Sequence, residues 1–274
     1  MPLHVVERDY ALSYVLAGIG EHATLGRVLA FKGGTALKKI YFRTYRFSED
    51  LDFTLLENIP PDDIARYLQD AVEQAQTLAR AYSPIEMTVA PKRHRDPHPR
   101  GQQDFAVSVR FPWHHHPQCA VKVEITRDEP IITPPVRRTI LHGYSHERFD
   151  ATVKVYTVEE IIAEKLRTLL QTHEQMKMKG WATRRGRDYY DLWRLLSAPH
   201  LAIDAGVLPA LLRKKCAARK VSYTSPDDFF HRTLQDDARR HWETSLRDLV
   251  PDLPPFDRVI AELRRHLDDL SLVD

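Results

Sequence analysis

The feature that most constrains this chain is a pair of glycines followed closely by two aspartates in an apolar run. Phe31-Lys32-Gly33-Gly34-Thr35-Ala36-Leu37 comes first, and Ser48-Glu49-Asp50-Leu51-Asp52-Phe53 begins thirteen residues after the threonine. Two adjacent glycines permit backbone angles and close approaches that a Cβ atom forbids. We therefore expect a tight turn, a short helix capped by Thr35 and beginning at Ala36-Leu37, and then a strand that carries the aspartates.

This motif predicts a phosphate site beside a metal site. Side chains alternate along a strand, so Asp50 and Asp52 should share one face while Leu51 and Phe53 point into the core. Neighbouring carboxylates repel unless a cation lies between them, and hard oxygen ligands suit Mg²⁺ or Mn²⁺. The start of a helix offers free N–H groups to an anion. Together these features are typical of phosphoryl or nucleotidyl transfer; the alternative is a solvated turn before an unrelated strand.

Composition limits the class of protein. The chain has 274 residues, 43% of them hydrophobic, which suffices for one large domain or two small ones. The net charge of +2 excludes a dedicated nucleic-acid binder, so any basic contact surface must be local. Cys119 and Cys216 predict reduced thiols rather than a disulfide framework. No apolar run approaches the roughly 18 residues of a membrane span, and the N-terminus lacks a signal-peptide pattern, so we expect a soluble, cytoplasmic protein.

Residues 1–155 are expected to form a core with a mixed sheet. Helical periodicity covers 7–29, with Gly20 as a stop, and a long helix from Pro61 to about residue 82. Strands are expected at 28–31, 85–89, 104–111 and 120–126. In the last of these, Val121, Val123 and Ile125 alternate with Lys122 and Glu124. If this strand pairs near the aspartates, Glu124 is the third carboxylate; the alternative is an ordinary exposed strand face.

Residues 156–274 are expected to be mainly helical. An extended crossing at 130–138 leads to a capping box at Thr157-Val158-Glu159-Glu160, which starts a helix containing Lys165. A lysine among apolar neighbours either extends out of a packed face or reaches a phosphate. Further helices are expected at about 204–219, 226–247 and 255–270. Basic side chains on these helices (Lys214, Lys215, Arg219, Lys220, Arg239, Arg240 and Arg247) are expected to be solvated.

Two cationic loops are candidates for contact with an RNA backbone. One is Lys92–Arg100, with Lys92, Arg93 and Arg95; the other is Lys177–Arg187, with Arg184 and Arg185. The alternative for both is a solvated loop. His114-His115-His116 is not expected to bind metal, because adjacent histidines rarely converge on one ion and no partner stands at zinc-like spacing.

These motifs resemble a known family. Lys32–Leu37, Arg46–Phe53, Glu164-Lys165-Leu166-Arg167 and the pattern Arg-x-x-Asp-x-Tyr-Asp-Leu from residue 185 are similar to those of AbiEii/AbiGii (MenT-like) nucleotidyltransferase toxins. That family lies within the DNA polymerase β-like nucleotidyltransferase superfamily, and the resemblance covers about residues 25–195. It implies an α+β fold, with a mixed β-sheet core and flanking helices in the N-terminal part and a helical C-terminal part that completes the active site.

The resemblance also implies an activity: Mg²⁺-dependent transfer of a nucleoside monophosphate from an NTP to an acceptor. The enzyme would be a toxin with a cognate antitoxin, and some members add nucleotides to the 3′ end of tRNA and so block aminoacylation. Modification of a protein hydroxyl and a non-catalytic binding module are the alternatives, the latter disfavoured by the intact motifs. The implied roles are metal binding for Asp50, Asp52 and Glu124, phosphate binding for Gly33, Gly34, Thr35 and Ser48, and triphosphate contact for Lys165. The resemblance also implies an essential carboxylate in the helix that carries Asp188 and Asp191; we favour Asp188, with Asp191 more structural. The alternative is that both aspartates only cap this helix and pair with Arg184 or Arg187.

Overall fold

The computed structural model describes residues 1–92, 101–144 and 146–272, so the predicted RNA contacts Arg93 and Arg95 lie outside the described residues. The chain divides into two compact units. Unit 1 comprises Met1–Glu129 and Pro135–Tyr156, and unit 2 comprises Pro130–Pro134 and Thr157–Asp274. Within the described ranges, no helix is both long and apolar enough to cross a membrane.

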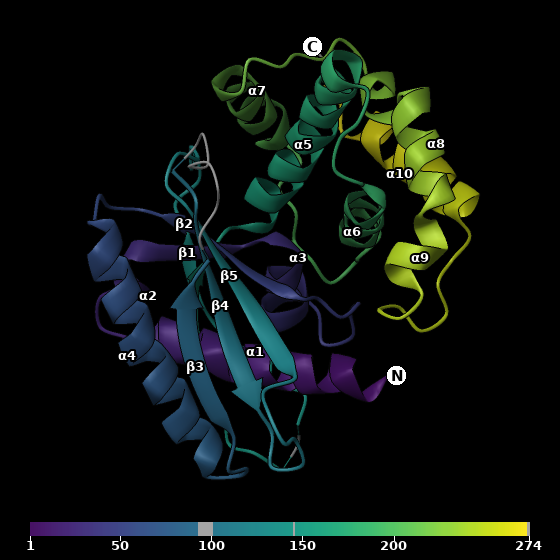
Figure 1. Ribbon diagram of the computed structural model, residues 1–274. Coiled ribbons are helices and arrows are strands. Elements are labelled where there is room, and N and C mark those ends of the chain that lie inside the picture. The colour runs from purple at the N-terminus through teal and green to yellow at the C-terminus, as the bar shows by residue number, and fades with distance from the viewer. Residues whose placement is uncertain (93–100, 145, 273–274) are drawn as a thin grey trace. The chain divides into compact units, whose positions relative to one another are not determined.

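Unit 1 is built on a seven-stranded mixed sheet with the strand order β3-β4-β5-β2-β1-β7-β6 (Figure 1). The central strand β2 pairs with β1 in antiparallel and with β5 in parallel orientation. The expected α+β fold with a mixed sheet is therefore confirmed. The strands are β1 Leu29–Lys32, β2 Asp50–Leu55, β3 Glu86–Pro91, β4 Gln103–Arg110, β5 Cys119–Thr126, β6 Val136–Thr139 and β7 Thr152–Val155.

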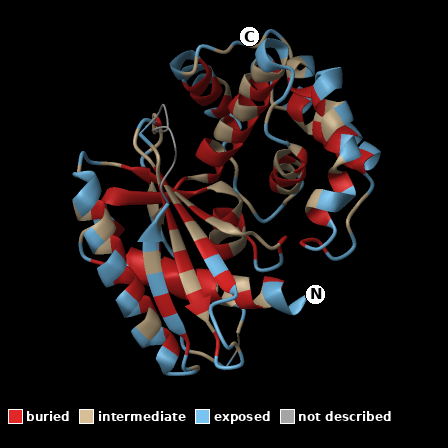
Figure 2. Ribbon diagram, viewed as in Figure 1, coloured by how far each residue is buried: buried red, intermediate tan, exposed pale blue. Residues whose placement is uncertain are grey.

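Helices α1 (Leu3–Glu21) and α4 (Pro61–Arg80) pack against each other and against strands of the sheet. Figure 2 shows α1 buried along most of its length, whereas α4 buries one face and exposes the other. The two helices approach so closely at Gly18 that a Cβ there would lie 2.1 Å from the carbonyl oxygen of Ala71. Leu51 and Phe53 of β2 are completely buried, as the alternation predicted. The strand's other face is left for the aspartates.

Several elements of unit 1 differ from expectation. The helix expected over 7–29 ends at Glu21, and a separate short helix, α2 (Leu25–Val28), precedes β1. Strands β6 and β7 were not expected, and β7 extends the sheet by pairing in parallel with β1 at Phe31 and Val155. After β1 come α3 (Gly33–Ala36) and a π-helical turn, η1 (Leu37–Tyr41).

Unit 2 is helical. Helix α5 packs against α7, α6 and α8, and α6 packs against α10. The helix expected over 226–247 is divided into three, with breaks at His231 and His241, whose backbones leave the helical region at ψ values of 137° and 8°. The elements are α5 Val158–Lys179, α6 Gly186–Leu196, α7 Leu208–Ala218, η2 Pro226–Phe230, α8 Arg232–Arg240, α9 Trp242–Leu246 and α10 Phe256–Asp269.

Of the two residues predicted to form the capping box at the start of α5, only Thr157 has the expected role. Thr157 accepts a hydrogen bond from the backbone N–H of Glu160, as a cap should. The Glu160 carboxylate, however, accepts from the N–H groups of Ile132 and Thr133 at 3.1 Å each, and pairs with Lys215 at 2.7 Å. Both charged side chains are completely buried, so the expectation that Lys215 is solvated was wrong. A buried charge requires such a partner, and this pair fastens the crossing segment to α5.

Candidate active site

The glycine turn is shaped around an aspartate of the neighbouring strand. Gly33 has a φ of +76°, a conformation that L-residues with side chains rarely adopt. A Cβ at Gly33 would lie 2.3 Å from Oδ2 of Asp52, well inside contact distance. Lys32, the preceding residue, is paired in register with Asp52. Glycine is therefore needed here both for the backbone angle and to leave room for the carboxylate.

Thr35 does not cap the following helix. Helix α3 already begins at Gly33, and the Thr35 side chain is completely buried within it. Its hydroxyl donates to the carbonyl oxygen of Asp50 and lies 2.6 Å from the hydroxyl of Ser48. The expected cap was wrong because the helix starts three residues earlier, at Gly33. Thr35 instead joins the glycine turn to the beginning of β2.

Asp50 and Asp52 lie on one face of β2, opposite the buried Leu51 and Phe53. In the parallel ladder with β5, Asp50 is paired with Lys122 and Asp52 with Glu124. Residues paired in this way project from the same face of a sheet. The strand pairing needed to bring Glu124 beside the aspartates is therefore present.

Lys122 forms an ion pair with Glu124 within this face. Carboxylates of this kind fit a hard divalent cation by donor chemistry. In the geometry described for residues 1–92, 101–144 and 146–272, though, no three Asp, Glu, His or Cys side chains converge as ligands. Asp50 and Asp52 would hold such a cation, and Glu124 would join them only after leaving Lys122.

Asp104 on β4 was not predicted as a residue of this face. It is paired with Glu124 in the β4–β5 ladder, so a row of residues crosses the sheet from Asp104 through Glu124 and Asp52 to Lys32. Asp104 is 6% exposed and accepts a hydrogen bond from the Gln102 amide at 2.7 Å. The alternation of β4 contained the signal, because Asp104 has the same parity as the more polar side of that strand, but only the register places it beside Glu124.

In unit 2, Lys165 joins two carboxylates of the next helix. Its ammonium nitrogen lies 2.8 Å from Oδ1 of Asp188 and 2.8 Å from Oδ2 of Asp191. The Asp191 side chain is completely buried, whereas that of Asp188 is 16% exposed. Lysine and aspartates lie 23 and 26 residues apart in sequence, and the packing of α6 against α5 brings them together.

Arg185 completes this charged cluster. Its guanidinium pairs with Asp188 at 3.2 Å and donates to the hydroxyl of Thr172 on α5 at 2.7 Å. Burial tends to raise the pKa of Asp188, but the positive charges of Lys165 and Arg185 outweigh it and hold the pKa below its usual range. Asp188 is therefore ionised near neutral pH. It is the more accessible of the two carboxylates bound to Lys165.

The cationic side chains predicted to contact RNA differ in their exposure and in their ion pairs. Lys92 is exposed, and its backbone N–H donates to the carbonyl of Asp104. Arg184 is exposed, whereas Arg185 is half-buried in the cluster with Asp188.

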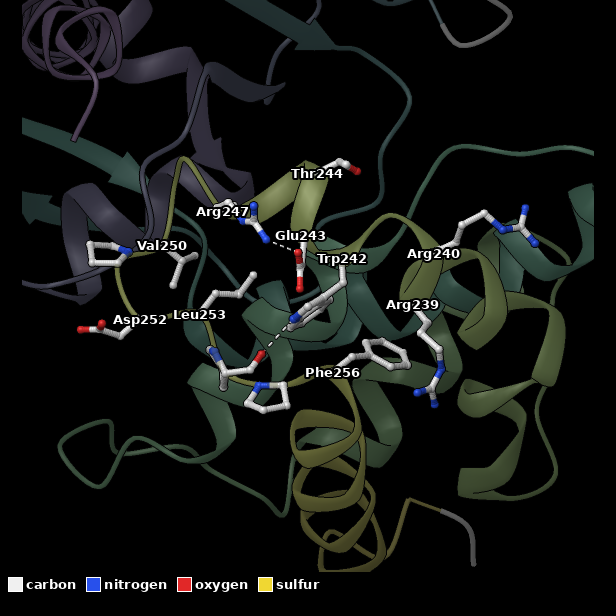
Figure 3. A pocket seen from close by; sticks show the side chains of 13 residues that line it. Arg239, Arg240, Trp242, Glu243, Thr244, Arg247, Val250, Asp252, Leu253 and Phe256 are labelled. Carbon is white, nitrogen blue, oxygen red and sulfur yellow. Dashed lines mark hydrogen bonds and ion pairs between the residues drawn. The ribbon is translucent and has the colours of Figure 1, made fainter.

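A hollow of about 810 Å³ lies elsewhere in unit 2, between α8, α9 and the segment before α10 (Figure 3). Trp242 forms part of its lining and donates its indole N–H to Pro254. Arg247 pairs with Glu243, and Arg239 pairs with Asp257, so two of its arginines are neutralised. None of the residues predicted to act in catalysis lines this hollow.

Comparison with known proteins agrees with the sheet and its motifs. The family described as "Nucleotidyl transferase AbiEii toxin, Type IV TA system" matches residues 14–262. This chain belongs to that family. As an AbiEii-family nucleotidyltransferase toxin of a type IV toxin–antitoxin system, it has the identity that its motifs predicted. The match includes both the glycine–aspartate motif of unit 1 and the Lys165 cluster of unit 2.

The fold of this AbiEii-family chain also resembles a solved toxin structure. MenT4, a nucleotidyltransferase toxin from Mycobacterium tuberculosis H37Rv, aligns with a TM-score of 0.68 over 99% of this chain and 85% of that one. The two sequences are 21% identical, so this likeness concerns the fold. A comparison with curated proteins gave no significant match.

Proposed function

We propose that this AbiEii-family toxin transfers a nucleoside monophosphate from an NTP to the 3′ end of tRNA and thereby blocks translation. The observation that carries the proposal is the face of β2, where Asp50 and Asp52 stand beside the Gly33 turn. The acceptor hydroxyl attacks the α-phosphorus and releases its proton to solvent. A new P–O bond forms, the bond to the bridging oxygen breaks, and pyrophosphate leaves.

Asp50 and Asp52 are proposed to hold Mg²⁺ or Mn²⁺, with Glu124 as a third ligand once Lys122 releases it. Such a cation, when bound, neutralises charge on the phosphates. The backbone N–H groups of Gly33 and Gly34 are proposed to receive phosphate oxygens, because a glycine-rich turn at a helix start exposes them. Thr35 and Ser48, whose hydroxyls are 2.6 Å apart, hold this turn against β2. Ser48, which is only half-buried, is proposed to present its hydroxyl to the nucleotide.

Lys165 and Asp188 are proposed to be required for the same reaction, as the family resemblance implies. Lys165 supplies an ammonium that is fixed by two carboxylates, so little side-chain entropy remains to be lost when it contacts a triphosphate. Asp188 keeps that ammonium oriented. Asp191, which is completely buried, is proposed to hold Lys165 in place and to have a structural role.

The acceptor is proposed to contact cations of the two segments identified from the sequence. Lys92, Arg93, Arg95, Arg184 and Arg185 would neutralise phosphates of the tRNA backbone. The protein would act in the cytoplasm, where tRNA and NTPs are present, and a cognate antitoxin would restrain it. Removal of Lys92, Arg93, Arg95 and Arg184 should weaken tRNA binding while sparing NTP binding; an equal loss of both would contradict their assignment.

The acceptor end can be tested with chemically altered tRNA. Purified protein is incubated with divalent cation, each α-³²P-labelled NTP in turn, and total tRNA that is either intact or oxidised with periodate. Oxidation destroys the terminal 2′,3′-diol, so label should enter only intact tRNA. Equal labelling of both samples would contradict attack by the 3′ end, and labelling of protein instead would favour modification of a protein hydroxyl.

A further inference from the structure

The chain leaves α5 through a short segment that exposes large apolar side chains. Trp181 is 69% exposed and Met178 is 81% exposed. Helix α5 ends at Lys179 and is capped by Gly180, whose φ of +73° is left-handed and turns the chain away from the helix axis. Neither side chain is buried against the rest of unit 2. Packing within this unit therefore gives no reason for two large apolar side chains at the end of the helix.

Trp181 differs in this respect from the other exposed tryptophan, Trp113. Trp113 is 58% exposed, but its indole N–H donates to Glu7 at 2.6 Å and its ring stacks on Phe111 with a centroid separation of 5.0 Å. Trp181 has neither an aromatic ring contact nor a hydrogen-bond partner for its indole among the described residues. The fold therefore explains the position of Trp113 but not that of Trp181.

The surroundings of Trp181 are cationic. The ammonium of Lys179 lies 5.9 Å from the centre of the Trp181 ring. Lys179 and Arg184 are exposed and form no ion pair within the part of the chain that the structure describes. The nearby acidic residue Glu174 is already paired with Lys177 at 2.8 Å. The positive charge of the segment is thus available to an anionic partner.

We propose that Trp181 stacks on an unpaired base of a single-stranded RNA whose phosphates contact Lys179 and Arg184. The inference rests on the proposed function, in which the acceptor is RNA. An exposed indole amid unpaired cations offers the two contacts that single strands use, a flat ring for a base and positive charge for the backbone. Stacking tolerates any base, so Trp181 would increase affinity for the strand without selecting a sequence.

Trp181 lies just beyond the C-terminal end of α5, at a distance from the Lys165 cluster. Lys179 follows Lys165 by fourteen residues of the same helix, which at about 1.5 Å per residue is about 21 Å. A base on Trp181 would belong to a nucleotide remote from the groups that Lys165 contacts. We therefore expect Trp181 to affect binding of the RNA and not binding of the NTP.

The experiment measures binding of a fluorescein-labelled, single-stranded eight-nucleotide RNA by anisotropy, without NTP or divalent cation. Full-length wild type is compared with Trp181→Ala, Trp181→Phe and the matched control Trp113→Ala. We expect Trp181→Ala to weaken binding by roughly 5- to 100-fold, Trp181→Phe to retain most of the affinity, and Trp113→Ala to match the wild type. Binding of ATP alone should be the same for all four proteins.

The salt dependence of RNA binding distinguishes the stacking contact of Trp181 from the phosphate contact of Lys179. Trp181→Ala should leave the slope of log K against log salt unchanged, whereas Lys179→Gln should reduce its magnitude by about 0.7 for a lost phosphate contact. Unchanged RNA affinity in Trp181→Ala would overturn the proposal, as would a Trp181-dependent change in ATP binding or in self-association. If wild type transfers label to tRNA while Trp181→Ala binds RNA normally, only the stacking contact fails. If wild type neither binds nor modifies RNA, the RNA acceptor fails as well.

Discussion

Gly33 and Asp52 approach so closely that a Cβ on the glycine would lie 2.3 Å from a carboxylate oxygen of the aspartate. Gly33→Ala should therefore displace Asp52 and also strain a backbone whose φ is +76°. We expect nucleotidyl transfer to fall by at least about 100-fold and the free energy of unfolding to fall by about 1–2 kcal/mol. Urea denaturation and label transfer measure the two effects.

Gly143→Ala is the matched control for this substitution. Apart from its two chain neighbours, no described residue has a heavy atom within 4 Å of a Cβ at Gly143, and its φ is not in the left-handed region. Activity of Gly143→Ala should equal that of the wild type. If Gly33→Ala retained full activity, the close fit of the turn around Asp52 would have no role in the reaction.

The ion pair between Lys122 and Glu124 should oppose binding of a divalent cation. Lys122→Met frees Glu124 and removes a positive charge from the face that carries Asp50 and Asp52, so we expect Mn²⁺ to bind about tenfold more tightly. Electron paramagnetic resonance of free Mn²⁺ measures this in the absence of nucleotide. Lys154→Met removes the same charge from β7, where the lysine donates to the carbonyl of Arg27, and should have little effect. Equal tightening in both variants would mean that net charge alone was responsible.

Replacement of Asp188 and replacement of Asp191 should have different effects on the free energy of unfolding and on transfer. Asp191 is completely buried against Lys165, so Asp191→Ala leaves a buried ammonium short of a partner and should lower the free energy of unfolding by about 3–5 kcal/mol. Asp188→Asn should cost less stability, because Asp188 is more exposed and Asp191 still pairs with the lysine, yet it should abolish transfer. Denaturation and transfer assays on both variants distinguish the roles. Full activity of Asp188→Asn would move the essential carboxylate to Asp191.

Acid should destabilise the fold through His173. Burial, followed by the neighbouring His231, lowers the pKa of His173 below its ordinary value of about 6.5. The ring centroids of His173 on α5 and His231 at the start of α8 are 3.6 Å apart. Between 6.5 and the lower folded pKa, the unfolded chain binds a proton that the folded chain does not, so the free energy of unfolding falls as pH drops through that window.

His173→Asn should make this decline shallower between about pH 7 and pH 5, as measured by urea denaturation at each pH. The pKa values of His22 and His142 are also lowered, mainly by burial, so part of the decline should remain. His4→Asn, at an exposed position of α1, is the control and should leave the slope as it is. A wild-type slope in His173→Asn would contradict the assignment.

The sequence predicted the part of the fold that local pattern determines. Alternation in β2, β4 and β5 identified the buried faces, and the apolar stripe of α4 identified its length to within two residues. The strand β7 was missed because it has four residues and pairs with β1 at a single register position, so its position depends on partners distant in sequence. The break at His231 was missed because no glycine or proline stands there.

For the candidate site, the sequence identified residues but not their partners. The motifs indicated Asp50, Asp52 and Lys165 directly. The place of Asp104 beside Glu124 follows from strand register, and the burial of Lys215 follows from a segment that crosses between the units. Both are long-range relationships that composition and periodicity do not contain.

The most direct test of nucleotidyl transfer compares α-³²P- and γ-³²P-labelled NTP with wild type and Asp52→Asn, and with Asp62→Asn, an exposed carboxylate of α4, as control. We predict that label from the α-phosphate enters tRNA with wild type and Asp62→Asn but not with Asp52→Asn, while label from the γ-phosphate appears only in pyrophosphate. Transfer of the γ-phosphate to the acceptor, or transfer that survives Asp52→Asn, would contradict the account.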